Sequence, residues 1–463
     1  MAIATTDPRT GEVLRSFDEL TPEELDQRIA RAAAAAERYR LTTFDQRAGW
    51  LRAAAGILDD RTDEIAAMMT LEMGKTKKAA AAEVTKCATC LRYYADNGAD
   101  FLADEPVEPD AVNAQRAYAR YLPLGVVLAI MPWNFPLWQA MRFAAPALMA
   151  GNVGLLKHAS NVPQTALFME ELFREAGFPE DVFQTLLIGS GQVDSVIRDD
   201  RVAAATLTGS EGAGVAVART AGESLKKVVL ELGGSDPFIV MPSADLGEAA
   251  KVATTSRCQN NGQSCISAKR FIVHTDVYDE FADLFAKEMS ALVVGDPMED
   301  GTDVGPLATE QGRADVEAQV HDAVGKGATV VLGGERPDRP GWWYPPTLVT
   351  GVTEEMDMYH EEVFGPVAQL FRVADVEEAV RLANTTRFGL GSNAWTNDAS
   401  EQEVFVRDLA AGQTFINGMT TSFPALPFGG VKASGHGREL AAHGMREFTN
   451  LKTVWVGKGT RSS

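Results

Sequence analysis

Residues 126–136 read Val126-Val127-Leu128-Ala129-Ile130-Met131-Pro132-Trp133-Asn134-Phe135-Pro136. The first six side chains are apolar and predict a short strand. Proline cannot continue a strand ladder, so the prolines at 132 and 136 place a turn directly after it. We therefore expect a core strand that ends at a turn carrying one tryptophan and one asparagine.

Outward from this stretch, short apolar runs alternate with amphipathic segments. Further strands are predicted at 153–157, 183–187 and 203–207, with a helix over 162–176. A second set of strands is predicted at 271–274, 329–332, 368–372 and 414–417. This alternation is typical of parallel sheets covered by helices, so we expect an α/β protein with two such sheets. Paired glycines in Leu232-Gly233-Gly234-Ser235 mark the hinge between them.

Two helices are predicted in the N-terminal region, over 26–38 and 46–58, with Thr21-Pro22 at the start of the first. Strands near 115–122 and 452–456 fit neither sheet. Unpaired strands of this kind often join another subunit, so a homodimer or homotetramer is expected.

Composition excludes several kinds of partner. The 463 residues carry a net charge of −21, which argues against nucleic acid and anionic membrane surfaces. The N-terminus shows no secretory signal, and the four cysteines form no disulfide framework, so a cytoplasmic protein is expected. Cys87 and Cys90 lie in a helical pattern without a completing ligand pair, and no metal site is expected.

One cysteine stands out by its surroundings. It ends the run Gln259-Asn260-Asn261-Gly262-Gln263-Ser264-Cys265, a turn rich in glycine and amides between a predicted helix and strand. A structural cysteine usually lies among apolar residues, whereas a nucleophilic one needs access and nearby donors. The setting of Cys265 favours the nucleophile.

A phosphate site is suggested less directly. The Gly189-x-Gly191 pair lacks the third glycine of a dinucleotide fingerprint, because Asp194 stands there. After the next strand, Ser210 is a plausible N-cap whose helix start offers free N–H groups to an anion. Lys157, at the end of another strand, is placed to bind a ribose or phosphate.

Taken together, the motifs resemble those of the aldehyde dehydrogenase superfamily over nearly the whole chain. They are Pro132 to Pro136, Glu231-Leu232-Gly233-Gly234, Gly262 to Cys265, Glu362-Val363-Phe364-Gly365-Pro366 and Pro427-Phe428-Gly429-Gly430-Val431-Lys432. The resemblance implies two Rossmann-like domains and a small oligomerisation β-segment. It divides the chain into a cofactor-binding domain (1–112 and 130–232), a catalytic domain (233–431) and oligomerisation segments (113–129 and 440–460).

The resemblance also implies a mechanism. Cys265 adds to the aldehyde carbon to give a thiohemiacetal that can release hydride, and Asn134 with the Cys265 N–H stabilises the oxyanion. Glu231 activates the water that hydrolyses the thioester, and burial after an apolar run is expected to raise its pKa. The implied cofactor contacts are Trp133, Asn134, Lys157, His158, Ala159, Ser160, Ser210, Glu211, Leu232, Glu362 and Phe364.

Two positions refine the cofactor. NAD-preferring relatives commonly carry glutamate where Ser160 stands, so a serine beside Lys157 predicts a preference for NADP, with NAD used less efficiently. Many relatives carry threonine where Glu211 stands, which leaves its phosphate contact in doubt.

Within the superfamily, the chain is most similar to bacterial NADP-dependent succinate-semialdehyde dehydrogenases. Arg142 and Ser422 match their carboxylate-binding residues, whereas Gln259 replaces a second arginine. Succinic semialdehyde is therefore the expected substrate. One alternative is a broad-specificity aldehyde dehydrogenase, or one that acts on another semialdehyde or an aliphatic aldehyde. An acylating enzyme is disfavoured by the base Glu231, and the alternative from another class is a catalytically silent binding protein on the same fold.

Overall fold

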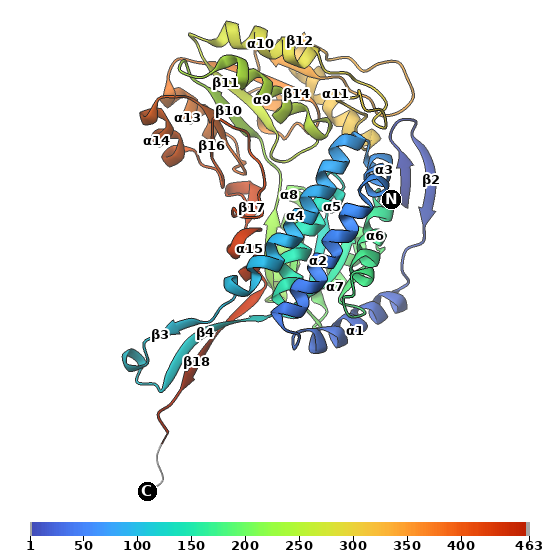
Figure 1. Ribbon diagram of the computed structural model, residues 1–463. Coiled ribbons are helices and arrows are strands. Elements are labelled where there is room, and N and C mark those ends of the chain that lie inside the picture. Colours follow the sequence, from blue (N-terminus) through green and yellow to red (C-terminus); the bar gives the residue numbers. More distant parts are fainter. Residues whose placement is uncertain (1, 460–463) are drawn as a thin grey trace.

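Two mainly parallel sheets, each flanked by helices, organise the computed structural model, which describes residues 2–459 (Figure 1). The strand from the opening stretch is β5, at the centre of a six-stranded sheet. Its order is β17 (Gly435–His436), β9 (Lys227–Glu231), β8 (Val202–Thr208), β5 (Val126–Met131), β6 (Val153–His158) and β7 (Phe183–Thr185). Only β17 pairs antiparallel, where Gly435 faces Glu231.

Helices on this sheet follow from their end signals. Helix α1 (Pro22–Tyr39) starts at Thr21, which forms a reciprocal capping box with Glu24. Helix α5 (Pro136–Ala150) starts with proline at its first position and is buried along its length against β5 and β6. The remaining helices are α2 (Phe44–Asp60), α3 (Thr62–Met73), α4 (Lys77–Phe101), α6 (Pro163–Glu175), α7 (Val193–Arg198) and α8 (Glu211–Glu223).

The seven-stranded sheet is built from the later part of the chain. Its order is β12 (Thr329–Leu332), β13 (Thr347–Thr350), β14 (Val367–Val373), β11 (Ala268–His274), β10 (Asp236–Val240), β15 (Asn393–Trp395) and β16 (Phe415–Ile416). Strand β12 alone runs antiparallel to its neighbour. The accompanying helices are α9 (Leu246–Cys258), α10 (Tyr278–Ser290), α11 (Glu310–Gly325), α12 (Asp357–His360), α13 (Val376–Asn384) and α14 (Ala399–Asp408).

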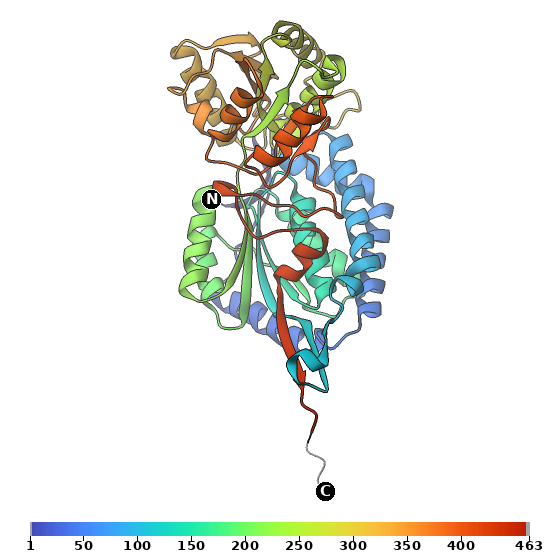
Figure 2. The same cartoon turned by 90° about the vertical axis from the view of Figure 1, so that its left-hand side faces the viewer.

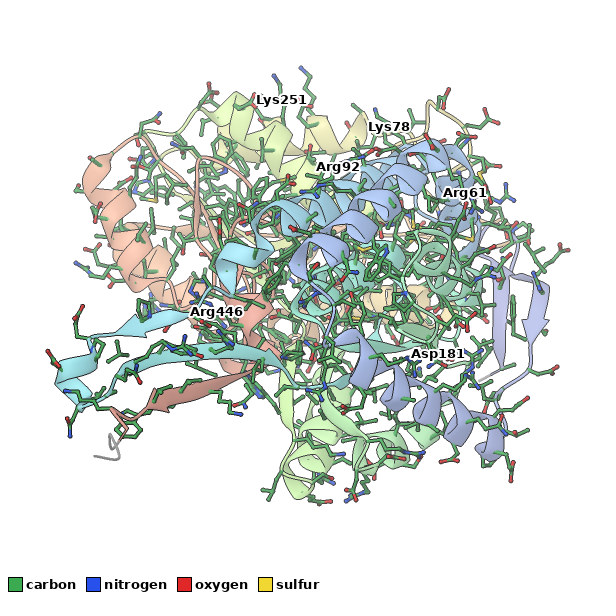
Figure 3. All side chains as sticks on the ribbon, turned by 60° about the horizontal axis from the view of Figure 1, so that its bottom comes forward. Arg61, Lys78, Arg92, Asp181, Lys251 and Arg446 are labelled. Atoms are coloured by element: carbon green, nitrogen blue, oxygen red, sulfur yellow. The ribbon has the colours of Figure 1, made fainter. Side chains whose placement is uncertain are left out.

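A three-stranded antiparallel extension projects from the body of the molecule (Figures 1 and 2). Strand β18 (Thr449–Val456) pairs with β4 (Arg116–Pro123) along its full length, and β3 (Glu105–Val107) lies on the other side of β4. Helix α15 (Ala441–Glu447) leads into β18, and its Arg446 donates to the Phe101 carbonyl at the base of the extension (Figure 3). Both strands predicted outside the two sheets are therefore present.

The predicted α/β class and the two parallel sheets are confirmed, with small differences at strand ends. The strand predicted to reach residue 187 ends at Thr185. The ribbon of β1 (Ile3–Asp7) and β2 (Glu12–Phe17) was not predicted. Short 3-10 turns cover Pro109–Val112, Ser190–Gln192 and Lys432–Ser434, and a turn with left-handed backbone angles covers Gln259–Gly262. Among the described residues, no helix has the length and apolar character needed to cross a membrane.

Candidate active site

The turn before Cys265 is held in a conformation that its residues favour. Asn260 and Asn261 have φ values of 54° and 57°, in the left-handed region that asparagine tolerates better than most residues. Gly262 also has positive φ (72°), and a Cβ there would lie 2.3 Å from the Gly365 carbonyl carbon. The Asn261 amide ties the turn down by donating to the Gly74 and Pro306 carbonyls at 2.8 and 2.9 Å. The cysteine therefore sits on a fixed platform.

Cys265 borders two cavities. The first, of about 230 Å³, is lined by Pro132, Trp133, Asn134, Gln139, Thr208, Gly209, Ser210, Leu232, Gly233, Cys265, Glu362 and Phe364. The second, of about 100 Å³, includes Lys86, Phe135, Trp138, Arg142, Gln259, Cys265, Ser422 and Phe428 in its wall. We call the first the cofactor-side cavity and the second the substrate-side cavity. The thiol thus lies where two ligands would meet.

Aromatic and charged groups shape the cofactor-side cavity. Trp133 and Phe364 meet edge to face, with ring centroids 5.7 Å apart. Glu362 pairs with the buried Lys269 at 3.2 Å. Lys269 Nζ also donates to the Ser264 and Cys265 carbonyls, each at 2.7 Å. The buried Lys269 ammonium therefore holds both the backbone at Cys265 and the carboxylate of Glu362, which lines the cavity.

Asn134 is oriented toward the cysteine turn. Its Nδ2 donates to the Gln263 backbone carbonyl at 3.2 Å, and the backbone carbonyl of Asn134 accepts from Asn260 Nδ2 at 2.8 Å. An amide nitrogen carries two N–H groups, so one stays available for an oxyanion in the cofactor-side cavity, which Asn134 and Cys265 both line.

Glu231 is not among the residues that line either cavity. Its side chain is buried, and both carboxyl oxygens lack a hydrogen-bond partner among the described residues. The carboxyl lies against Gly429, where an added Cβ would be 2.7 Å from Oε1. Burial raises the pKa of Glu231 well above its ordinary value, and the neighbouring Glu439 adds to the rise. The expected direction of the shift is confirmed.

The thiol itself is held in its protonated form. Burial raises the pKa of Cys265 to about 12, although Arg142 acts in the opposite direction. Attack on a carbonyl therefore requires the proton to leave as the bond forms, because the thiolate is the nucleophile.

The four cofactor residues predicted at the end of β6 lie in four different environments. Lys157 is buried and makes neither an ion pair nor a side-chain hydrogen bond within residues 2–459, although burial lowers its pKa. The His158 ring is turned into the core, where Nε2 donates to the Pro136 carbonyl at 2.7 Å and burial lowers its pKa to about 4. Ala159 packs in a small apolar cluster with Trp133, and Ser160 is half-buried. None of the four lines the cofactor-side cavity.

The start of α8 contributes Ser210 and Glu211. Ser210 is the N-cap and lines the cofactor-side cavity, as does Leu232, which packs against Gly214. Glu211 is held away from a free phosphate role, because Arg387 donates to both of its oxygens at 2.9–3.0 Å. Its negative charge is therefore neutralised within the protein.

The two predicted carboxylate-binding residues meet in the substrate-side cavity. Arg142 Nε lies 2.7 Å from Glu439 Oε2, and the guanidinium stacks on Phe428 with Cζ 4.3 Å from the ring centroid. Ser422 Oγ accepts a hydrogen bond from Trp138 Nε1 at 3.0 Å. Gln259 lines the same cavity without adding charge.

The sequence as a whole matches a family model described as "Aldehyde dehydrogenase family", over residues 1–454. The chain belongs to this family. It is 62% identical over 456 residues to succinate-semialdehyde dehydrogenase [NADP(+)] 1 of Mycobacterium tuberculosis, covering 98% of this chain and 100% of the relative. It is 63% identical over 458 residues to succinate-semialdehyde dehydrogenase [NADP(+)] of Mycobacterium avium, covering 99% and 97%.

Solved structures of aldehyde dehydrogenases have the same architecture. Succinic semialdehyde dehydrogenase from Streptococcus pyogenes, in complex with NADP+, superposes with a TM-score of 0.96 at 40% identity, covering 99% of this chain and all of the other. The structure titled "Structural insights into cofactor and substrate selection by Gox0499" gives the same TM-score and identity. The predicted aldehyde dehydrogenase fold is confirmed.

Three charged residues of this aldehyde dehydrogenase were missed by the sequence analysis: Lys86, Lys269 and Glu439. Lys86 lies in a helical pattern, where a lysine usually faces solvent. Glu439 directly follows Arg438, and two adjacent residues of opposite charge usually indicate an exposed segment. Only Lys269 had a signal, because it stands with Arg270 inside an apolar strand, where a charge needs a buried partner.

Proposed function

We propose that this aldehyde dehydrogenase oxidises succinic semialdehyde to succinate with NADP as hydride acceptor. The observation that carries the proposal is the position of Cys265 between two cavities, one with the aromatic and acidic residues of a nicotinamide site and one lined by two cations. The mycobacterial relatives named for this substrate and cofactor support it.

The protein residues act in sequence. Cys265 Sγ bonds to the aldehyde carbon as its proton passes to solvent water, and Asn134 Nδ2 and the Cys265 N–H donate hydrogen bonds to the negative oxygen that forms. A nicotinamide held beside Glu362 and Phe364 would supply the acceptor for the hydride of this tetrahedral carbon. Glu231 then takes a proton from water as the water attacks the thioester, which frees the Cys265 thiolate and the carboxylic acid. Glu231 precedes Leu232 and Gly233, which line the cofactor-side cavity together with Cys265.

The residues near Lys157 fit an NADP phosphate. The buried Lys157 ammonium forms no ion pair among the described residues, and only the Glu19 carboxylate acts on it from a longer range, so a bound anion is favoured there. Ser160, three residues further along the chain, adds a hydroxyl donor without adding negative charge. Lys157 and Ser160 would hold the 2′-phosphate, while Ser210, Glu362 and Phe364 border the nicotinamide end.

A substrate panel tests the proposal directly. Purified enzyme is assayed with succinic semialdehyde, glutaric semialdehyde and butanal, each with NADP and with NAD, by absorbance of the reduced nicotinamide. We expect the highest kcat/KM with succinic semialdehyde and NADP. Higher values with butanal, or with NAD, would assign the enzyme to the alternatives of a broad aliphatic substrate range or an NAD preference.

We also propose that the β-extension joins subunits into a homodimer or homotetramer. The extension exposes large apolar side chains, among them Leu451 (53% exposed) and Trp455 (55% exposed). Its outer strand β18 leaves one edge open for pairing. Sedimentation of the full chain and of a Leu451→Lys/Trp455→Lys variant tests this, since a monomeric wild type would contradict it.

A cytoplasmic location stays a prediction from composition.

A further inference from the structure

The substrate-side cavity holds a cation that the catalytic steps leave unused. Lys86 lies on α4 and is half-buried in the cavity wall. Its Nζ donates to Ser422 Oγ at 2.8 Å and lies 4.3 Å from the centroid of the Trp138 ring. The ammonium is thus held in the wall of the same cavity that Arg142 and Cys265 line.

The other charges around this cavity are already paired. Arg142 is neutralised by Glu439 at 2.7 Å, and Glu83, one helical turn before Lys86, forms an ion pair with Lys75. No aspartate or glutamate is among the described residues of the wall, and within residues 2–459 Lys86 makes no ion pair of its own. The cavity therefore carries one positive charge in excess, and that charge belongs to Lys86.

Hydrogen-bonding capacity near Lys86 is also left over. Ser422 Oγ accepts from both Lys86 Nζ and Trp138 Nε1, so its lone pairs are used and its own O–H remains to be donated. An ammonium has three N–H groups, and Ser422 takes one of them. The Arg142 Nη2 nitrogen is buried without a hydrogen-bond partner in the described part of the chain. These donors belong to three residues that line the same cavity.

We propose that Lys86 binds the distal carboxylate of the substrate, together with Ser422 and Arg142, and makes the enzyme selective for aldehydes that carry an acid group at the far end. This inference rests on the proposed function and deepens it. Gln259 lines the cavity without charge, so Lys86 is the second cation of the site.

Burial gives this lysine a reason to bind an anion. It lowers the pKa of Lys86 to about 8, and the nearby Arg142 contributes to the lowering. A desolvated ammonium gains more from a carboxylate partner than an exposed one does. The bound carboxylate would return the charge balance of the cavity to zero.

The test compares three variants. Lys86→Met keeps the apolar stem and removes the charge, Lys86→Arg keeps the charge, and Lys78→Met removes an exposed lysine of the same helix as a control (Figure 3). For each, the ratio of kcat/KM for succinic semialdehyde to that for butanal is measured with NADP. We expect Lys86→Met to lower this ratio at least about 10-fold, equivalent to about 1.4 kcal/mol, while Lys78→Met leaves it unchanged.

The Lys86→Arg variant, which keeps the positive charge, distinguishes a role in binding the carboxylate from a role in packing. Lys86→Arg should keep the ratio within about threefold of the wild type, whereas a purely structural role would lower both activities together in Lys86→Met and leave the ratio unchanged. An unchanged ratio in Lys86→Met would overturn the inference.

A second readout separates this inference from the proposed function. Succinate and the uncharged succinamide are compared for their protection of Cys265 against iodoacetamide. Should the wild type prefer butanal, the proposed function fails, and protection then decides on Lys86 alone. We expect the concentration of succinate for half-protection to rise at least 10-fold in Lys86→Met and to stay unchanged in Lys78→Met; equal protection in Lys86→Met would refute the role.

Discussion

Arg142→Ala is predicted to weaken the fold as well as the substrate site. Arg142 and Glu439 form an ion pair in which the side chains are only 2% and 4% exposed. Removing one member of a buried pair leaves an uncompensated charge and typically costs about 3–5 kcal/mol. The remaining carboxyl, next to Glu231, would escape that cost by taking up a proton.

The cost of that proton gives the expected magnitude. Protonating a glutamate whose pKa in the unfolded chain is about 4.3 costs up to about 3.7 kcal/mol of folding free energy at pH 7. The same protonation costs about 1 kcal/mol at pH 5. Burial already raises the pKa of Glu439 in the wild type, with Arg142 lowering it, so the variant shifts it further in the same direction. A raised pKa in the folded state means that stability is lost as pH rises above the unfolded pKa. The loss of stability caused by the unpaired carboxyl should therefore be about 3–4 kcal/mol at pH 7 and about 1 kcal/mol at pH 5.

Urea unfolding followed by tryptophan fluorescence measures this at both pH values. Arg381→Ala is a matched control, because its ion pair with Glu378 is exposed and contributes at most about 1 kcal/mol. The double variant Arg142→Ala/Glu439→Ala should recover part of the loss. A loss below 1 kcal/mol at pH 7, or an equal loss at both pH values, would refute the reasoning. In the folded variant, KM for succinic semialdehyde should also rise; an unchanged KM would argue against this substrate.

Three further predictions concern the chemistry. Cys265→Ala should abolish turnover while NADP binding, followed by fluorescence titration, is retained; residual dehydrogenase activity would exclude Cys265 as the nucleophile. Glu231→Gln should lower steady-state turnover about 10²–10⁴-fold and leave a burst of reduced nicotinamide in stopped-flow absorbance, because hydride transfer precedes hydrolysis. Loss of the burst would place Glu231 before hydride transfer. Ser160→Glu should lower kcat/KM for NADP at least 10-fold and raise that for NAD, because a carboxylate repels the 2′-phosphate; an unchanged ratio would show that residue 160 does not read the cofactor.

Local patterns were enough to predict the main elements. The apolar run of β5, the capping pair at the start of α1 and the alternation of strands with helices each depend on neighbours within a few residues. End positions were less certain, and the ribbon of β1 and β2 was missed because half of it is exposed and lacks an apolar pattern.

The site residues that lie within contiguous sequence motifs could be predicted. Cys265, Asn134, Glu362 and Phe364 were singled out together, and the structure brings them to one cavity. The position of Glu231 outside the lining of both cavities, and the inward turn of the His158 ring, could not be read from motifs, because a rotamer is chosen by packing partners far away in the chain.

The sequence by itself determined the fold class, the family and the reacting cysteine, since these depend on short-range periodicity and on residues within contiguous motifs. Only the tertiary structure decided which charges are paired. Arg142 meets Glu439, Glu211 meets Arg387 and Lys86 is left beside Ser422, across separations of 297, 176 and 336 residues. The free energy of a charge depends on burial and on the nearest opposite charge in space, and both are properties of the folded chain.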